Sequence, residues 1–128
     1  MAFFKRKKQE QQPKTEEQQM VKKEDLLEEI EICQNKLASN NDEDHVPLFN
    51  RLGSLYFELE DYDQSIRYYE QSIEQNKVMG KAFTDLVKLY NIKRKQASSE
   101  NDRDGVQYYL QKSDELMKLT KDTIRGNM

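Results

Sequence analysis

Residues 46–77, VPLFNRLGSLYFELEDYDQSIRYYEQSIEQNK, carry the clearest structural pattern of this chain. In its first half, large and small residues recur at i, i+3, i+4 and i+7 on one helix face: Phe49, Leu52, Gly53 and Tyr56. A turn signal, EDYD, follows at 60–63, after which Ser65, Tyr69 and Ser72 recur at i, i+4 and i+7. The pattern predicts two antiparallel helices joined by a short turn.

This arrangement resembles the tetratricopeptide repeat, a helix–turn–helix unit of about 34 residues. The family carries a large apolar residue, a Leu, a small residue and a Tyr on the first helix, then small, aromatic and small residues on the second. The chain departs from the family at Ser65 and Ser72, where Ala is usual, and at Lys77, where a Pro is usual. Small residues at Gly53 and Ser65 let the two helix backbones approach closely.

A second, degenerate unit follows one repeat length later. The large residues of the first helix recur as Phe83, Leu86 and Tyr90. Val87 takes the place of the small residue, and the second helix starts six residues late, because SIRYYEQS at 65–72 aligns with GVQYYLQK at 105–112. The polar stretch QASSENDRD therefore predicts an inserted surface loop at 96–104.

A further helix is predicted upstream, where apolar residues recur at i, i+4, i+7 and i+11: Leu26, Ile30, Cys33 and Leu37. The end of a repeat stack needs a cover, so this helix is expected to cap the first repeat. The predicted fold is all-α, an α-solenoid of antiparallel helix–turn–helix repeats with about five helices. Residues 21–128 form this domain, with a capping helix at 24–39 and repeats at 46–79 and 80–124.

Residues 1–20 are expected to form a disordered basic arm, because the stretch 9–19 lacks apolar residues that would offset the entropy of ordering. Residues 1–23 carry seven basic and three acidic side chains, net +4, whereas the remainder carries 14 basic and 21 acidic ones, net -7. The arm combines two aromatic and four basic residues that suit an anionic membrane surface or a nucleic acid: Phe3, Phe4, Lys5, Arg6, Lys7 and Lys8.

The sequence lacks the residues that an enzyme or a metal site needs, so we expect neither catalysis nor a cofactor. His45 is the only histidine and Cys33 the only cysteine, and Cys33 lies on the predicted apolar stripe. A run from Glu100 to Gly105 echoes a calcium loop, but Gln111 stands where a bidentate Glu is required. The single cysteine and the absence of a signal peptide or a long apolar run favour the cytoplasm.

The resemblance implies a protein-binding adaptor. In the family, the first helices of the repeats line a concave groove, and the matching positions here are Asn50, Ser54, Phe57, Lys81, Thr84, Lys88 and Asn91. Amide, hydroxyl and cationic groups around one aromatic ring suit an extended peptide with an acidic group.

Two alternatives remain open. The chain is a peripheral factor that touches a membrane or a nucleic acid through its basic arm, or it is a homo-oligomeric structural subunit of a larger complex. An exposed Leu116 or Met117 on the last helix would favour a homodimer through the terminal helices.

Overall fold

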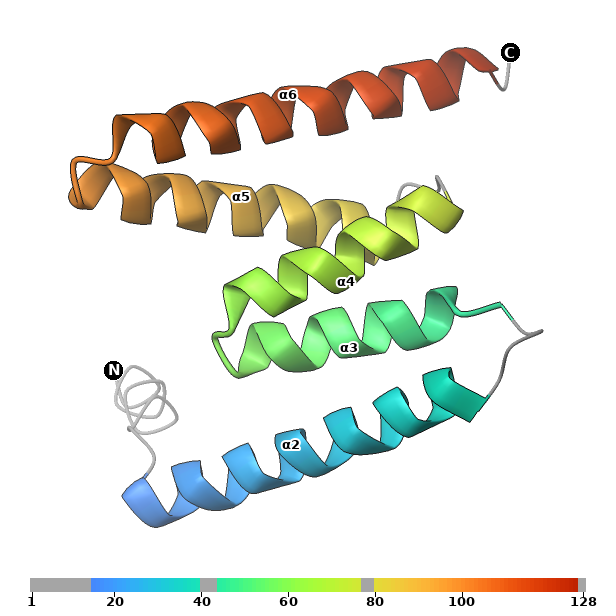
Figure 1. The fold of residues 1–128 in the computed structure, drawn as a ribbon, viewed down its shortest axis with the longest axis vertical. Coiled ribbons are helices and arrows are strands. Elements are labelled where there is room, and N and C mark those ends of the chain that lie inside the picture. The colour runs from blue at the N-terminus through green and yellow to red at the C-terminus, as the bar shows by residue number, and fades with distance from the viewer. Residues whose placement is uncertain (1–14, 40–43, 77–79, 127–128) are drawn as a thin grey trace, which may run out of the picture.

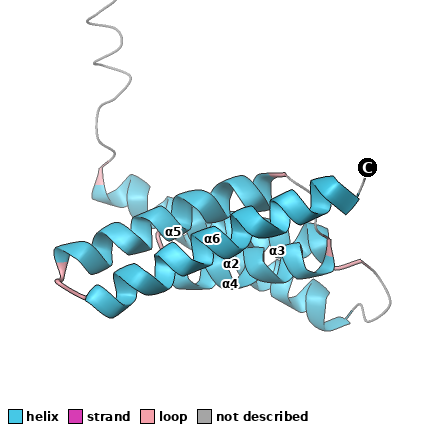
Figure 2. Cartoon of the chain, turned by 90° about the horizontal axis from the view of Figure 1, so that it is seen from above, coloured by secondary structure: helices cyan, strands magenta, loops and turns pink. Residues whose placement is uncertain are grey.

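The computed structural model describes residues 15–39, 44–76 and 80–126. These residues form five α-helices and no strand: α2 (Glu16–Ser39), α3 (Val46–Glu58), α4 (Tyr62–Gln75), α5 (Lys81–Ser99) and α6 (Arg103–Gly126). The helices stack in chain order, each packed on the one before it (Figure 1). Short loops join α3 to α4 and α5 to α6 (Figure 2). The predicted all-α stack of helix pairs is confirmed.

The first pair, α3 and α4, is built around a close approach at Gly53. A Cβ atom added to Gly53 would lie 2.8 Å from the ring of Tyr69, a distance that leaves no room for a side chain. Ser65 is buried beside this contact, and its hydroxyl donates a hydrogen bond of 2.7 Å to the carbonyl oxygen of Gly53. The small residues predicted at these two positions thus lie where the helices meet.

The turn between α3 and α4 is tight and capped. Glu60 takes a left-handed backbone conformation with φ of 63°. The Asp61 side chain then accepts a hydrogen bond of 3.3 Å from the backbone N–H of Gln64, which satisfies one of the first amide donors of α4. Asp61, as the N-cap residue, therefore helps to fix the start of α4 directly after the predicted turn.

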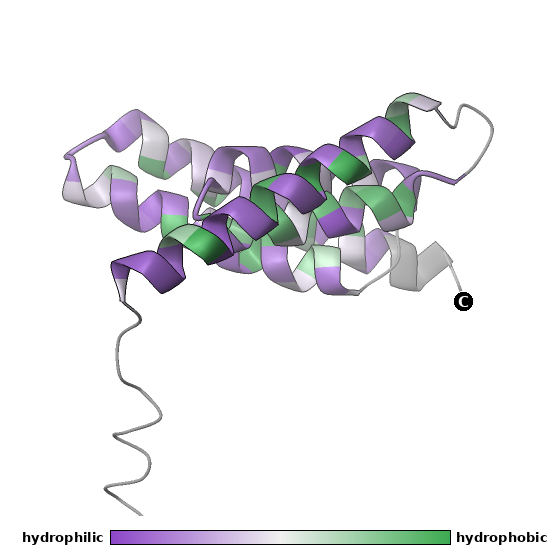
Figure 3. Cartoon of the chain, turned by 90° about the horizontal axis from the view of Figure 1, so that it is seen from below, coloured by the Kyte–Doolittle hydropathy of each residue, from purple (hydrophilic) through white to green (hydrophobic). Residues whose placement is uncertain are grey.

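Two apolar clusters hold the stack together. One joins α2 to α3 through Leu26, Ile30, Cys33, Leu52 and Leu55. The other joins α4, α5 and α6 through Tyr69, Ile73, Ala82, Leu86, Leu89, Tyr90 and Leu116. The predicted stripe of the capping helix is confirmed, and burial raises the pKa of the Cys33 thiol. The outer surface of α2 mixes hydrophilic and hydrophobic bands (Figure 3), and four of its large hydrophobic residues are exposed: Met20, Val21, Leu27 and Ile32.

The start of α2 corrects the predicted boundary of the arm at residue 20 and of the capping helix at residue 24. The helix begins at Glu16, because Thr15 and Gln18 form a capping box. The Thr15 hydroxyl accepts a hydrogen bond of 3.2 Å from the backbone N–H of Gln18, whose side-chain oxygen accepts one of 3.1 Å from the backbone N–H of Thr15. Residues 1–14 lie outside the described residues.

The predicted loop at 96–104 is also corrected. Helix α5 continues to Ser99 and α6 begins at Arg103, so only residues 100–102 connect them. Ala97 is buried, and a Cβ atom on Gly105 would lie 3.0 Å from the Cβ of Ala97, so a contact between small residues holds the last turn of α5 in place. Asp102 caps α6 by accepting a hydrogen bond of 3.0 Å from the Gly105 N–H.

None of the described helices combines the length and apolar character that crossing a membrane requires. On the last helix, Leu116 is buried, whereas Met117 is 44% exposed.

Replacing Gly53 by Ala should lower the free energy of unfolding by about 1–3 kcal/mol, because the new methyl group overlaps the Tyr69 ring and forces α3 and α4 apart. Gly53→Leu should cost more. Chemical unfolding followed by circular dichroism measures both.

Gly80→Ser is the matched control, because a Cβ atom at Gly80 meets nothing within 4 Å and Ser is as good an N-cap residue as Gly. Its stability should stay within about 0.5 kcal/mol of the parent chain. An unchanged stability of Gly53→Ala would show that the α3–α4 register is wrong.

Candidate functional site

The residues predicted to line a groove lie on α3 and α5, two helices that contact each other directly. The members on α5 are all exposed and follow one another at i, i+3, i+7 and i+10, which places them on one face of the helix: Lys81, Thr84, Lys88 and Asn91. The members on α3 are half-buried: Asn50, Ser54 and Phe57. The seven residues thus divide into an exposed row on α5 and a partly covered row on α3.

The residues on α3 hold the first repeat together as well as bordering the face. The side-chain oxygen of Asn50 accepts a hydrogen bond of 2.6 Å from the hydroxyl of Ser72 on α4. Phe57 packs against the core cluster and meets the ring of Tyr62 edge-on, with centroids 6.0 Å apart. Substituting these residues would therefore affect stability as well as the surface.

On α5, Lys81 is paired with an acidic neighbour. Its ammonium lies 3.3 Å from the carboxylate oxygen Oδ2 of Asp85, one helical turn later. Asp85 is only 7% exposed, and the Tyr69 hydroxyl donates a hydrogen bond of 2.6 Å to the same oxygen. Because Asp85 offsets the charge of Lys81, the ammonium of Lys88 supplies the positive charge further along this face.

The buried carboxylate of Asp85 was missed by the sequence analysis. The Lys81–Asp85 spacing of four residues is a readable signal for an ion pair on a helix surface. The contact with Tyr69 was not readable, because it joins residues sixteen positions apart on two different helices. Tyr69 was predicted only as a packing residue, and it also places a hydroxyl against α5.

Burial and a neighbouring carboxylate raise the pKa values of two core tyrosines, Tyr69 and Tyr90. Burial, the hydrogen bond to Asp85 and the negative charge of Asp85 all raise the pKa of Tyr69 above its ordinary value. The Tyr90 hydroxyl donates a hydrogen bond of 2.5 Å to Glu70, and burial together with that carboxylate raises the pKa of Tyr90. Both phenols stay protonated in the folded chain at neutral pH.

The predicted contact residues of the arm lie outside the described residues: Phe3, Phe4, Lys5, Arg6, Lys7 and Lys8. Within the described ranges, no group of three or more His, Cys, Asp or Glu side chains is arranged to hold a metal ion.

Comparison with known families matches residues 46–77 to the family described as tetratricopeptide repeat. The match spans α3, α4 and the turn between them, the stretch on which the resemblance was based. Comparisons with curated proteins and with solved structures found no match. Residues 46–77 are therefore a tetratricopeptide repeat, and α5 and α6 continue the stack beyond the matched segment.

The free energy of unfolding should fall as the pH rises above about 10, the ordinary pKa of a tyrosine. With the pKa values of Tyr69 and Tyr90 raised in the folded state, the unfolded chain releases protons that the folded chain keeps. The contribution is complete below pH 10 and is lost progressively above it. Urea unfolding at pH 8 to 11 measures the decline.

The free energy of unfolding of the variant Tyr69→Phe/Tyr90→Phe should fall less over the same pH range. At pH 8 it should already be about 1–3 kcal/mol less stable, because Asp85 loses a buried hydrogen-bond donor. If the free energy of unfolding fell equally for the variant and the parent chain, Tyr69 and Tyr90 would not be the cause of the pH dependence.

Proposed function

From the tetratricopeptide repeat at residues 46–77 we infer that this protein is a non-enzymatic adaptor that binds an extended segment of a partner protein along the face shared by α3 and α5. Repeats of this kind serve as protein-interaction modules. The observation that carries the proposal is the row of exposed polar side chains on α5, beside the half-buried row on α3.

Lys88 and Asn91 are the two residues on this face best suited to a partner. Both are exposed, and within the part of the chain that the structure describes neither makes a hydrogen bond or an ion pair. They are three positions apart on α5, so they are neighbours on the helix surface. An ammonium and an amide side by side suit a carboxylate, which accepts charge-assisted hydrogen bonds. The partner segment is therefore expected to carry an acidic side chain.

On α3, Phe57 gives the same face an apolar border. Phe57 is partly exposed at the end of its helix, where its ring meets that of Tyr62. An apolar side chain of the partner would pack there, while the acidic side chain meets Lys88. A peptide that combines both features would run across α3 and α5.

Affinity capture from native cell extract tests the proposal, with the parent chain beside Lys88→Ala/Asn91→Ala. These residues are exposed, so the double variant should keep the stability of the parent chain within about 0.5 kcal/mol. Gln107→Ala/Lys118→Ala is the matched control, because it removes one amide and one ammonium from exposed positions on α6.

A protein retained by the parent chain and the control, and lost with Lys88→Ala/Asn91→Ala, supports binding at this face. Its binding segment, prepared as a peptide, should then bind the double variant about 10–100-fold more weakly in a calorimetric titration. Equal retention by all three proteins would move the binding surface away from α5.

A further inference from the structure

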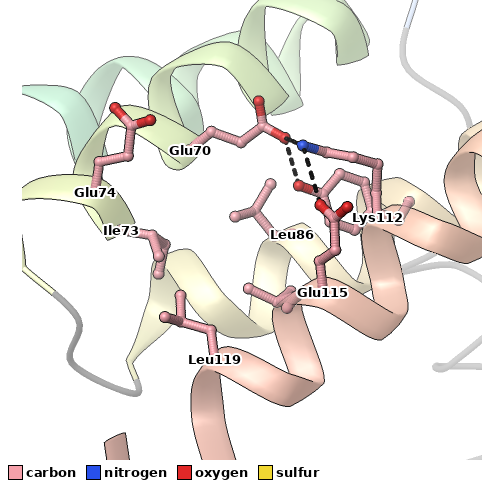
Figure 4. Close-up of a pocket in the computed structure, with 9 residues that line it drawn as sticks. Glu70, Ile73, Glu74, Leu86, Lys112, Glu115 and Leu119 are labelled. Carbon is pink, nitrogen blue, oxygen red and sulfur yellow. Dashed lines mark hydrogen bonds and ion pairs between the residues drawn. The ribbon is translucent and has the colours of Figure 1, made fainter. Parts of the chain in front are cut away.

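A separate hollow lies between α4, α5 and α6 and has no lining residue from α3 (Figure 4). Its volume is about 180 Å³, and its apolar wall consists of Ile73, Leu86, Leu116 and Leu119. The charged groups that line it are Glu70, Glu74, Lys112 and Glu115. A cavity of about 150 Å³ with apolar walls accepts benzene, so this hollow has room for one aromatic ring.

The charges of the hollow are not evenly matched. The Lys112 ammonium lies 3.2 Å from Glu70 and 4.0 Å from Glu115, and Glu70 also accepts the hydrogen bond from Tyr90 (Figure 4). Three carboxylates thus face one ammonium, a net charge of -2. Because Glu74 and Glu115 are exposed, they are the carboxylates that an incoming cation reaches first.

A second hollow adjoins the first and shares Glu70, Tyr90 and Lys112 with it. It continues between α4 and α6 toward Arg67 and the exposed Tyr108. At this end Arg67 balances the carboxylate of Asp63, whereas Glu74 and Glu115 at the other end add two negative charges, so the basic residues of an occupant belong there. The α4/α6 groove, as we call the two hollows together, fits a segment with an aromatic side chain followed by cations.

We propose that the α4/α6 groove binds residues 3–8 of a second copy of this chain. That segment has the required order, two aromatic residues followed by four basic ones: Phe3, Phe4, Lys5, Arg6, Lys7 and Lys8. One phenylalanine ring fills the apolar hollow, and the basic residues after it meet Glu74 and Glu115. The net charges, +4 for residues 1–23 and -7 for the remainder, favour the same pairing.

The occupant comes from another molecule because of where the groove lies in the stack. Helix α2, which follows the segment, is at one end, and α6 is at the other (Figure 1). Two helix packings of about 8–10 Å, α2 on α3 and α3 on α4, separate α2 from the nearer wall of the groove, and α2 begins on the left of the stack whereas α4 ends on the right (Figure 1). The twelve residues from Phe4 to Glu16 span at most about 40 Å when fully extended, so docking within one molecule would require an extended chain that crosses both the thickness of the stack and the length of α4.

Such a contact joins two different surfaces, so it does not close on itself. Each molecule in a pair still offers one segment 3–8 and one α4/α6 groove, and further copies add in the same way. This interface does not use the α3/α5 face and stands independently of the proposed function.

Sedimentation equilibrium of the full chain at low salt tests the proposal. The average mass should rise with concentration, from one chain of 15.3 kDa at about 10 µM to at least about twice that value at 500 µM. Added salt should reverse the rise, because the contact depends on charge. A constant mass of one chain would overturn the proposal.

Two variants and their mixture give the decisive comparison. Phe3→Ala/Phe4→Ala keeps an intact groove, and Glu74→Lys/Glu115→Lys keeps an intact segment. Each alone should remain a single chain, whereas an equal mixture should form a species with one molecule of each and nothing larger.

Glu31→Lys/Asp114→Lys is the charge-matched control, since it makes the same change at exposed positions that line neither hollow, and it should associate like the parent chain. Thermal melting of every variant verifies folding. Association that persists in the groove variant, or a mixture that stays as single chains, would overturn the proposal.

Discussion

The ring of Tyr69 lies against the backbone of Gly53, and this contact sets how α3, α4 and α5 pack together. The ring fixes the distance between α3 and α4, because even one added carbon at Gly53 would overlap it. The hydroxyl at the other end of the same side chain donates to Asp85 on α5. A single residue therefore sets the packing within the first repeat and the position of the helix that follows.

The contacts of Asp85 bear on the proposed function because they fix the start of α5. Its carboxylate accepts a hydrogen bond from the buried Tyr69 hydroxyl and pairs with the exposed Lys81 ammonium. The hydrogen bond from Tyr69 connects the beginning of α5 to α4. The exposed row that continues along α5 to Lys88 and Asn91 is thereby presented at a fixed angle to α3. A polar face on a rigid helix is better suited to holding an extended peptide than the same residues on a loop.

The two sides of the stack offer opposite chemistry. The α3/α5 face presents an ammonium and amides beside an aromatic ring, which suits an acidic segment. The α4/α6 groove presents exposed carboxylates around an apolar hollow, which suits a basic and aromatic one. The two proposed surfaces can therefore be occupied independently, and a change in one need not alter the other.

Sequence reasoning predicted what local periodicity encodes. Gly53, Ser65 and Tyr69 were assigned correctly because helix packing at short range imposes a regular pattern of small and large residues. The loop at 96–104 was predicted wrongly because the polar end of an exposed helix has the same composition as a loop. Helix α5 continues to Ser99, and the contact of Ala97 with Gly105 that supports its last turn cannot be read from composition.

The site was harder to predict than the fold. The partly covered state of Asn50 depends on Ser72, and the pairing of Asp85 depends on Tyr69, so both require knowledge of residues that lie far apart in the sequence. The groove residues predicted on α5 depend only on the spacing within one helix, and they are exposed as a row along one face of it.

A double-mutant cycle between Tyr69→Phe and Asp85→Ala shows whether Tyr69 links the first repeat to α5, because each single variant removes the hydrogen bond between them. Unfolding free energies of the parent chain, the two single variants and the double variant give the coupling between these side chains. We predict a coupling of at least about 1 kcal/mol, as expected for buried groups in one hydrogen bond. Additive effects would contradict the account, because the two helices would then be positioned without this contact.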